Sequence, residues 1–488
     1  MPYIQGDDRR QPTMFPAILD DYITESNPTR VIDAFVDSLD LAALGFDKTV
    51  LAETGRPPYA PNDLLKLFIY GYFNKVRSSR KLETETHRNV EVMWLLNNLK
   101  PDNKTISRFR KDNLAAIKRV FDSFVKLCVK MGLYSRQLAA IDGSHFQAVN
   151  SKALNYTKIK LQDRINRINN HISEYLTEIE ANDDEDSKTP ENENIVEIIA
   201  ELQSRKINYE KMLESMVESG ETQVSLTDPD SRLLIKGTSR KIAYNVITAT
   251  EGDNALIIDF EVTNSTDVGN MHKLAAKCKA ALGVDKLTSL ADKGFMSATD
   301  IANCLVEGVT ANVCMDEESL DFCIETDEIC EKLTSYTNGR IVHLKNRNIC
   351  VCPMGEVLYP QCYRKSKRAA RYYNKSACAN CTKKCTTSTY DVIDIVMKKS
   401  EFSKEFDVKN LKLKQIHYVP DKQLLKRRKS IAEHPFGIVK RCLGADYLLM
   451  KRFSAVTAEM ALAYLAFNMK RVINIIGIDK LMEGIVSA

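Results

Sequence analysis

The hydrophobic pattern of the chain changes at Leu138, from helical spacing to the spacing of strands. Three short runs rich in apolar and β-branched residues follow one another: LAAIDGSHFQAVN, KIAYNVITAT and ALIIDFEVTN. A helical stretch, VGNMHKLAAKCKAAL, comes next, and then the strand KLTSLADKG, the helix SATDIANCLVEG and the strand VTANVCM. Because the order is β, β, β, α, β, α, β, we predict an α/β fold class with a mixed sheet covered by helices.

The first 135 residues differ from this region because their apolar residues recur at helical spacing. Three helices are predicted in PNDLLKLFIYGYF, in KLETETHRNVEVMWLLNN and, capped by Thr105, in ISRFRKDNLAAIKRVFDSFVKLCVKMG. Two interpretations stay open: an all-α domain of helix-turn-helix type that binds DNA and dimerises, or a small structural bundle. The polar residues near the start of the third helix are Ser107, Arg108, Arg110 and Lys111.

Two insertions interrupt the predicted core. The core then consists of residues 136–157, 221–316 and 421–488. The first insertion, residues 158–220, repeats apolar residues at three- and four-residue steps along two arms, which predicts an antiparallel helical hairpin. Between Glu174 and Glu201 it carries eleven acids and one base, and the tip ANDDEDSKTPENEN is loop-like. Such a surface would be repelled from nucleic acid, so we expect the hairpin to contact protein or solvent.

The second insertion, residues 317–420, holds most of the cysteines and a basic run. Between Tyr363 and Lys384 there are eight Lys and Arg residues and no acid, interleaved with tyrosines at 363, 372 and 373. Cations among aromatic rings suit a phosphate backbone and unpaired bases. A solvated basic loop is the alternative.

Composition excludes several classes of protein. An apolar fraction of 44% over 488 residues is ordinary for a globular protein of several compact units, and no apolar run reaches membrane-spanning length. The N-terminal stretch lacks the charged-then-apolar pattern of a secretion signal. Many of the 13 cysteines stand singly in apolar stretches, as buried thiols do in a reducing compartment. We therefore expect a cytoplasmic protein without a membrane segment.

Three acids stand out by their local context. Asp142 lies inside the apolar strand AAIDGS, where an unpaired carboxylate would be costly, and Gly143 leaves room beside it. Asp292 lies at the end of the apolar strand in SLADKGF, and strand ends in α/β layers commonly carry sites. Glu433 is the only acid in KQLLKRRKSIAEHPFGIVKR, among seven Lys and Arg residues.

Each acid also has a structural interpretation. Asp142 could begin a bulge or turn with Gly143, and Asp292 could be a turn acid paired with Lys293. Ser430 and Glu433 match the S-x-x-E capping box of a helix start. Pro435 would then fall at the fifth helical position, where it removes a hydrogen bond. A helix that begins near Pro435, with Glu433 on the turn before it, avoids this conflict unless the proline kinks the helix.

If the three acids converge, they have one shared chemical meaning. Clustered carboxylates raise each other's pKa, and a divalent cation with a preference for oxygen ligands, Mg²⁺ or Mn²⁺, removes that conflict. Two such ions about 3.5–4 Å apart activate an attacking oxygen and stabilise a leaving oxygen in phosphodiester chemistry. Lys440 and Arg441, one to two helical turns past Glu433, could then reach a phosphate.

The motifs together resemble the DDE transposases of bacterial insertion sequences, in the branch with a helical N-terminal transposase domain. PPYAPNDLLKLFIYGYFNKVRSSRKLE and LKPDNKTISRFRKDN are similar to that helical domain, and VSLTDPDSRLLIKG with IAYNVITAT to the segment leading into the second core strand. LADKGF resembles the second-aspartate motif, and AEHPFGIVKR, with Glu459 and Asn468 after it, the glutamate motif and its trailing helices.

The resemblance implies an RNase H-like core, Mg²⁺ dependence and a homodimer associated with the nucleoid. It further implies binding to the terminal inverted repeats of the element, cleavage at its ends and joining of the 3′-OH to target DNA. By position, Asp142 takes the place of the first aspartate, Asp292 of the second and Glu433 of the glutamate. A catalytically silent, transposase-derived DNA-binding protein and an RNase H-like nuclease without strand joining are the alternatives.

The wider family often shows Y-x2-R-x3-E-x6-K around the glutamate. Lys440 fits this pattern, whereas the Arg position holds Lys429, the Tyr position holds Lys426, and Arg428 is one residue out of register. We therefore expect no stacking tyrosine here. The expected DNA phosphate contacts are Arg428, Lys429, Lys440 and Arg441.

The cysteines of the second insertion form a compact pattern. Cys378, Cys381 and Cys385 follow a C-x2-C-x3-C spacing, and Cys352 in NICVCPMGE could supply a fourth thiolate. Four thiolates around Zn²⁺ would hold together a loop too short to form a core. Cys350 and Cys362 compete as ligands, and free thiols are the alternative to zinc.

Overall fold

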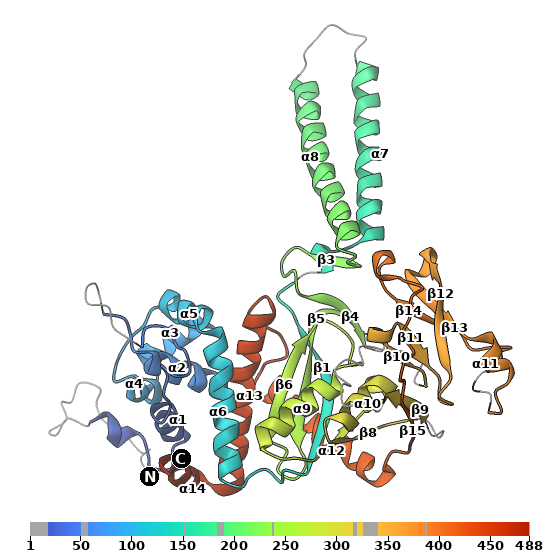
Figure 1. Ribbon diagram of the computed structural model, residues 1–488. Helices are drawn as coiled ribbons and strands as arrows, with labels where there is room; N and C mark the ends of the chain where they lie inside the picture. The colour runs from blue at the N-terminus through green and yellow to red at the C-terminus, as the bar shows by residue number, and fades with distance from the viewer. Residues whose placement is uncertain are drawn as a thin grey trace, which may run out of the picture.

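The computed structural model describes most of the chain as a mixed α/β protein (Figure 1). The predicted α/β fold class is therefore confirmed. The described residues are 18–49, 57–150, 152–182, 190–236, 239–315, 320–325, 340–383, 385 and 388–487.

The N-terminal region is entirely helical. Its helices are α1 (Pro28–Asp37), α2 (Pro61–Phe73), α3 (Ser79–Arg88), α4 (Val90–Leu95), α5 (Asn103–Asp112) and α6 (Leu114–Lys130). The second and third predicted helices are each divided in two, because Asn89 is extended between α3 and α4 and Asn113 separates α5 from α6. The predicted cap at Thr105 is wrong: the Asp102 side chain accepts from the Thr105 N–H, so Asp102 is the N-cap of α5.

A six-stranded sheet forms the centre of the molecule. Its strands are β1 (Leu138–Gln147), β4 (Arg232–Lys236), β5 (Ser239–Glu251), β6 (Ile257–Thr263), β7 (Leu287–Ala291) and β8 (Val309–Val313). The order is β4-β5-β1-β7-β8, and β6 pairs with the second half of β5 beyond β4. β1 and β6 are both antiparallel to β5, which lies between them, whereas β7 and β8 run parallel to β1.

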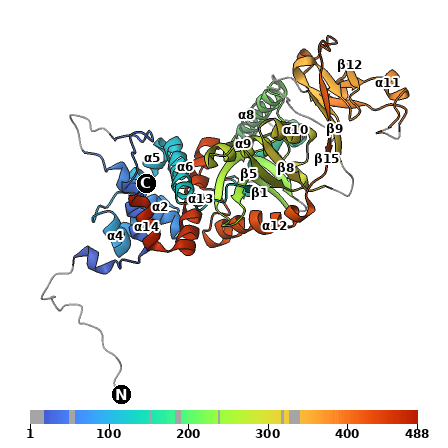
Figure 2. The same ribbon diagram turned by 60° about the horizontal axis from the view of Figure 1, so that its bottom comes forward.

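Helices cover both faces of this sheet. Helices α9 (Met271–Leu282) and α10 (Ala298–Val306) lie on one side, and α12 (Lys422–Gly437) lies on the other, as Figure 2 shows. Alternating strand residues explain this arrangement: Ala139 and Ile141 join the main core, while Ala140 joins a separate small cluster with α12.

The long helix α13 (Phe453–Ile476) joins the N-terminal region to the sheet. It packs against α2 and α6, and its Tyr464 hydroxyl lies 2.7 Å from the Thr248 hydroxyl of β5. Arg77, after α2, donates to the Glu459 carboxylate of α13 at 3.2 Å, and both side chains are buried. Burial raises the pKa of Glu459, while the nearby Arg110 and Arg77 favour its charged form. Helix α14 (Ile478–Val486) ends the chain against α1.

Residues 158–220, predicted to form a helical hairpin, contain α7 (Lys158–Asn182) and α8 (Pro190–Glu218). The two helices run side by side and project from the body of the molecule (Figure 1). At the base, β2 (Asn155–Thr157) pairs with β3 (Gln223–Ser225), and Leu161 and Met216 are buried. Residues 183–189 of the predicted acidic tip lie outside the described residues, and residues 190–194, predicted to be loop-like, are the first turn of α8 instead.

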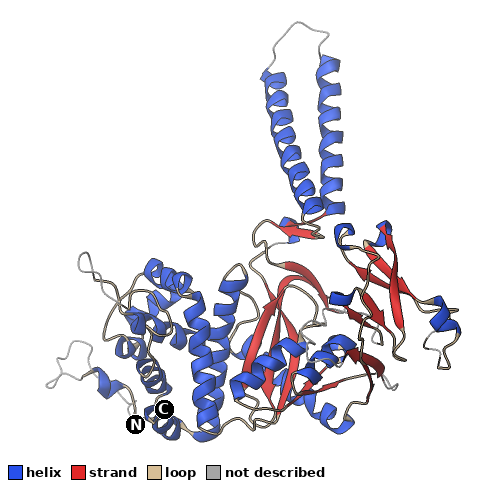
Figure 3. Ribbon diagram, in the orientation of Figure 1, coloured by secondary structure: helices blue, strands red, loops and turns tan. Residues whose placement is uncertain are grey.

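The second insertion is built mainly of strands, which the sequence did not predict (Figure 3). A five-stranded antiparallel sheet contains β10 (Val342–Leu344), β11 (Ile349–Val351), β12 (Val357–Arg364), β13 (Ala369–Tyr373) and β14 (Ile393–Val396). A two-stranded ribbon of β9 (Leu320–Glu325) and β15 (Leu413–Tyr418) connects it to the core. The five-stranded sheet has a small core of its own, which contains Cys350, Leu358 and Tyr372.

Within the described residues, no single helix has the length and apolar character needed to cross a membrane. α13 and α14 meet both criteria only as a pair that is bent by 112°.

Candidate active site

Asp142 and Asp292 lie side by side at one edge of the central sheet. The parallel register of β1 and β7 pairs Ala139 with Ser289 and Ala140 with Leu290. Asp142 comes two residues after Ala140, and Asp292 comes two residues after Leu290. The two aspartates are therefore at the same level on neighbouring strands, which lie about 5 Å apart. The register of two strands thus brings together residues that are far apart in the sequence.

Both aspartates belong to the sheet face that α12 covers. Ala140 and Leu290 pack against Ile431 and Ala432 of α12. Side chains two residues apart on a strand point to the same face, so Asp142, like Ala140, faces the helix.

The local contacts of Asp142 combine burial with a nearby cation. Its side chain is 8% exposed, and its Oδ1 accepts from the Gly143 N–H at 2.8 Å. Arg428 of α12 places its Nη1 3.8 Å from Asp142 Oδ2. Arg428 therefore lies beside a predicted metal ligand, although we expected it only as a phosphate contact.

Asp292 is half-buried and caps a short 3₁₀ turn, Lys293–Phe295, with its Oδ1 accepting from the Gly294 N–H at 2.9 Å. This turn agrees with the structural interpretation made from the sequence. The turn does not use the second carboxylate oxygen, so a capping role and a metal-binding role are compatible.

The predicted helix start near Pro435 is wrong. Helix α12 begins at Lys422, with Asp421 as its N-cap, and Pro435 lies inside it. Ser430 is in the middle of the helix, where its hydroxyl donates to the Arg427 carbonyl at 2.8 Å, so the capping box with Glu433 is also wrong. A π-helical turn, Ile438–Cys442, follows directly, and such turns accommodate irregular hydrogen bonding.

Glu433 is exposed, whereas Ile431 and Ala432 beside it pack against Ala140 and Leu290 of the sheet. Phe436 follows Glu433 in α12, and Lys440 lies in the π-helical turn after the helix. Phe436 packs near Phe146 at a ring distance of 6.4 Å, and the Lys440 ammonium donates to the Ser144 hydroxyl at 2.6 Å. Glu433 is thus carried by a helix that packs against β1, and its role as a metal ligand stays a prediction.

The four predicted phosphate contacts have different surroundings. Lys429 and Arg441 are exposed, and Arg428 is half-buried beside Asp142. The Lys440 ammonium is bound to β1 through Ser144 and the His145 carbonyl, and it lies 4.5 Å from the Phe146 ring. Lys440 therefore ties the turn after α12 to β1 in this structure, and its phosphate contact stays a prediction.

Among the described residues, no three His, Cys, Asp or Glu side chains are arranged to hold a metal ion as they stand. The donor set nevertheless fits a hard divalent cation, because carboxylate oxygens at one sheet edge are the ligands that Mg²⁺ and Mn²⁺ prefer. A buried amide oxygen without a hydrogen-bond partner, Asn245 Oδ1, faces the same edge.

The sequence interpretation missed Asp267, in the loop between β6 and α9. A Cβ atom on Gly143 would overlap the Asp267 Oδ1 atom, and a Cβ on Gly294 would lie 3.4 Å from its Oδ2. Asp267 therefore lies against the residues that directly follow Asp142 and nearly follow Asp292. The available signal was an acid shortly after a strand that runs parallel to β1 and ends at the same sheet edge.

The four cysteines predicted to bind zinc line one small cavity of about 20 Å³, beside Glu356 and Asp391. Cys352 lies in the β11–β12 turn, Cys378 in the short helix α11 (Lys375–Ala379), and Cys381 and Cys385 follow it. The two competing residues lie elsewhere: Cys350 is fully buried in the insertion core, and Cys362 is exposed on β12.

The basic run of the insertion is less available to nucleic acid than its sequence predicts. Arg364, Lys367 and Arg371 all approach the Asp394 carboxylate of β14 within 3.6 Å. The Arg371 guanidinium beside Asp394 lowers the pKa of that carboxyl to about 2. Tyr372 is a core residue, so it cannot stack on a base. Three of the eight cations are thus paired within a small sheet, whereas Lys365 and Arg368 of the same run are exposed.

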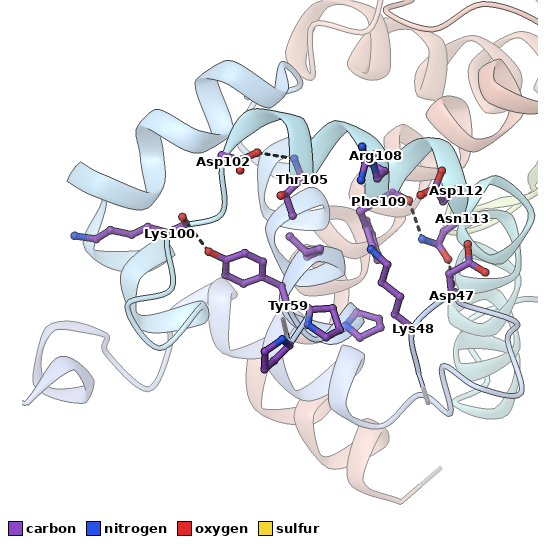
Figure 4. Close-up of a pocket in the computed structure, with 14 residues that line it drawn as sticks. Asp47, Lys48, Tyr59, Lys100, Asp102, Thr105, Arg108, Phe109, Asp112 and Asn113 are labelled. Atoms are coloured by element: carbon purple, nitrogen blue, oxygen red, sulfur yellow. Dashed lines mark hydrogen bonds between the residues drawn. The ribbon is translucent and has the colours of Figure 1, made fainter. Parts of the chain in front are cut away.

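The N-terminal domain contains a cavity of about 580 Å³ (Figure 4). It is lined by charged and apolar residues, including Lys48, Tyr59 and Arg108, and none of the three predicted catalytic acids lines it. Of the residues near the start of the predicted third helix, Ser107, Arg108 and Lys111 are exposed. Arg110 is buried over the Phe68 ring, so its role is structural.

Two family models match the chain. Residues 17–112 match the "Transposase domain (DUF772)", and residues 351–473, which include Glu433, match the "Transposase DDE domain". Together these matches indicate a DDE-type insertion-sequence transposase. The predicted family is thus confirmed, and with it a DNA transposase of a class that typically uses divalent metal ions.

A search of curated proteins gave no match for this transposase. Among solved structures, the piggyBac transposase synaptic complex with hairpin DNA matches at a TM-score of 0.32 with 8% identity. That alignment covers 95% of this chain and 79% of the other.

Proposed function

We propose that this transposase binds the terminal inverted repeats of its insertion sequence, cleaves DNA at the element ends and joins the 3′-OH to target DNA. The observation that supports the proposal is the parallel register of β1 and β7: Ala140 and Leu290 pair two residues before Asp142 and Asp292, and both pack against the helix that bears Glu433. These three carboxylates are the proposed metal ligands, and the enzyme acts as a homodimer.

The strand arrangement supports an RNase H-like core. Three antiparallel strands in the order β6, β5, β1 are followed by the parallel strands β7 and β8. In this arrangement the ends of β1 and β7 and the helix α12 meet at one edge, where a DNA backbone can approach from solvent.

The acids at this edge are proposed to bind metal ions, and the cations are proposed to bind DNA phosphates. Two Mg²⁺ or Mn²⁺ ions bound by the carboxylates would activate the attacking oxygen and stabilise the leaving one. Arg428, next to Asp142, and the exposed Lys429 and Arg441 are placed to hold phosphates. Lys440 ties the turn after α12 to β1.

Isosteric substitutions test this assignment. Asp142→Asn, Asp292→Asn and Glu433→Gln should each lower cleavage of element-end DNA in Mg²⁺ by more than a hundredfold, because each removes a charged metal ligand. Gel-shift affinity for the same DNA should stay near wild type. Asp285→Asn is the matched control, because Asp285 is an exposed acid at the opposite end of β7.

The products separate the alternatives. Strand-transfer products joined to target DNA are expected from the wild-type protein. Cleaved ends without joined products would indicate a nuclease, and binding without cleavage would indicate a silent DNA-binding protein. Wild-type cleavage by any one of the three variants would remove that residue from the site.

A further inference from the structure

Asp267 occupies a position that only the folded chain creates. It follows β6 in the loop before α9, and its carboxylate lies against the Cα side of Gly143 and of Gly294. A Cβ at position 143 would be 2.8 Å from Asp267 Cγ, and one at position 294 would be 3.0 Å from Asp292 Oδ1 and 3.4 Å from Asp267 Oδ2. The absence of side chains at both glycines lets this third aspartate approach the first two.

Asn245 of β5 holds Asp267 in this place. Its amide Nδ2 donates to Asp267 Oδ1 at 2.7 Å and to the Ser265 carbonyl at 3.2 Å. Asn245 is 1% exposed, and its Oδ1 has no hydrogen-bond partner. That oxygen faces the same space beside Gly143, where a Cβ would be 3.0 Å away. A buried acceptor without a donor destabilises the fold, so this atom points to a ligand that donates to it.

Helix capping does not explain Asp267. Helix α9 begins at Met271, and Asn270, its N-cap, makes no side-chain cap hydrogen bond. The first N–H groups of the helix, those of Met271 and His272, donate instead to the Asp300 carboxylate at 3.1 Å each. Since Asp300 serves the helix start, the Asp267 side chain is directed to the sheet edge.

We propose that Asp267 is a fourth carboxylate of the metal site and that Asn245 is the residue that positions it. This inference rests on the proposed function, because the cation is the one assigned to Asp142, Asp292 and Glu433. A hydrated divalent cation satisfies both groups: its charge offsets the third aspartate, and its retained waters donate to Asn245 Oδ1. The glycine of the IDGS sequence is then required by the fold of the site itself.

Direct metal binding tests the inference without activity. Mn²⁺ binding to the full-length protein, free of DNA, is titrated by electron paramagnetic resonance for wild type, Asp267→Asn, Asn245→Ala and Asp142→Asn. We expect Asp267→Asn to weaken Mn²⁺ binding at least tenfold and Asn245→Ala to weaken it about tenfold, as loss of supporting groups does. Asp285→Asn should bind like wild type, and circular dichroism checks that each variant is folded.

The outcomes distinguish this inference from the proposed function. If Asp142→Asn loses Mn²⁺ and Asp267→Asn binds like wild type, the fourth carboxylate is refuted and the proposed function stands. If no variant changes Mn²⁺ binding, the metal site itself is refuted. Weakened binding in Asn245→Ala only, without an effect of Asp267→Asn, would also overturn the assignment of Asp267.

The cysteine cavity carries a second, independent inference. The CPMG segment makes a turn in which the Gly355 N–H donates to the Cys352 carbonyl at 3.0 Å. A second turn joins the Cys381 N–H to the Cys378 carbonyl at 3.4 Å. Two thiol-bearing turns thus face one cavity, with Cys385 completing the lining.

We infer that Cys352, Cys378, Cys381 and Cys385 bind a structural Zn²⁺ ion. A tetrahedral set of four thiolates closes a site without open positions, as structural zinc does. The ion would join the β11–β12 turn to the segment after α11, where the described chain has few regular hydrogen bonds. Rotation of these side chains about their own bonds is needed to bring the sulfurs to ligand distance, because they do not converge as they stand.

Elemental analysis of the purified full-length protein tests the zinc site. About one zinc per chain is expected in wild type, as for a single structural site, and Cys352→Ser and Cys381→Ser should lose it. Cys362→Ser is the matched control, because this exposed cysteine lies outside the cavity and should retain zinc. If the serine variants are insoluble, metal-stripped wild type in reducing buffer is titrated with zinc instead. Zinc-free wild type that binds none on titration, or equal loss from Cys362→Ser, would refute the site.

Discussion

Aspartates occur in two contrasting surroundings in this transposase. Asp394 of the insertion is contacted by three cations of its own sheet, Arg364, Lys367 and Arg371. In the core, Asp292 and Asp267 instead lie near one another beside Gly294, and Asp142, which has Arg428 at 3.8 Å, is on the neighbouring strand. A carboxylate whose cations come from the chain stabilises the fold. Carboxylates that lie close together repel one another and destabilise the fold unless a cation binds to them. Removal of one charge should therefore destabilise the insertion and stabilise the core.

The largest effect is expected where an acid has its cation inside the protein core. Arg77→Met removes the donor at 3.2 Å from Glu459 and leaves a carboxylate that is 1% exposed. Removing one partner of a buried ion pair costs about 3–5 kcal/mol, because the other charge stays buried. Urea unfolding should show this loss, whereas Arg80→Met, at an exposed neighbouring position, should change stability by less than about 0.5 kcal/mol. Equal effects would show that the buried pair does not couple the two regions.

Gly143→Ala should cost about 1–3 kcal/mol, as overpacking does, and should also displace the Asp267 carboxylate that fills the space. Reduced Mn²⁺ affinity should accompany the lower melting temperature. Gly437→Ala is the control, because no atom lies within 4 Å of its added Cβ in α12 and alanine favours helix. Wild-type Mn²⁺ affinity in Gly143→Ala would show that the close approach of Asp267 is unimportant.

Asp394→Asn should destabilise the protein by about 1–2 kcal/mol, since three cations lose one carboxylate. The pKa of about 2 in the folded protein lies below the ordinary value of 3.8 for an aspartate, so this stability is present above pH 4 and is lost as the pH falls toward 2. Urea unfolding at pH 7 and pH 2.5 should therefore show a difference in stability between variant and wild type that narrows at the lower pH. A constant difference would contradict the charge origin of the effect.

The smallest effect should have the opposite sign. Asp292→Asn keeps the turn acceptor but removes one of the gathered charges, so we expect a gain of about 0.5 kcal/mol in buffer without divalent ions. Added Mn²⁺ should raise the melting temperature of wild type but not of the variant. Calorimetry in both buffers measures this, with Asp285→Asn as the unchanged control. If Asp292→Asn lost as much stability as Asp394→Asn, the two regions would not differ in their response to loss of charge.

The alternation of strands and helices after Leu138 could be predicted from the sequence, because the apolar residues of strands and helices recur at different spacings. The three acids were assigned from their resemblance to the family motifs, and their roles stay predictions. Asp267 could not be found this way: it is one acid in the loop NSTDVGN, and only the strand register and two glycines give it a position. Two further errors have local causes. Pro435 suggested a helix start, but it lies inside α12, shortly before the π-helical turn. The run of cations on β12 and β13 suggested a basic loop, because the acid that pairs with them, Asp394, is on the later strand β14.

The hairpin α7–α8 leaves the chain just after the strand that bears Asp142 and returns before that strand's antiparallel partner, β5. Asp142 and its register partner Thr248 are therefore separated by roughly a hundred residues of chain, and such non-local pairing slows folding. A helical hairpin forms from local contacts and brings its own ends together at the β2–β3 pair, so it shortens the loop that β1 and β5 must close. We therefore expect early formation of the hairpin to speed the pairing of β1 with β5 during folding.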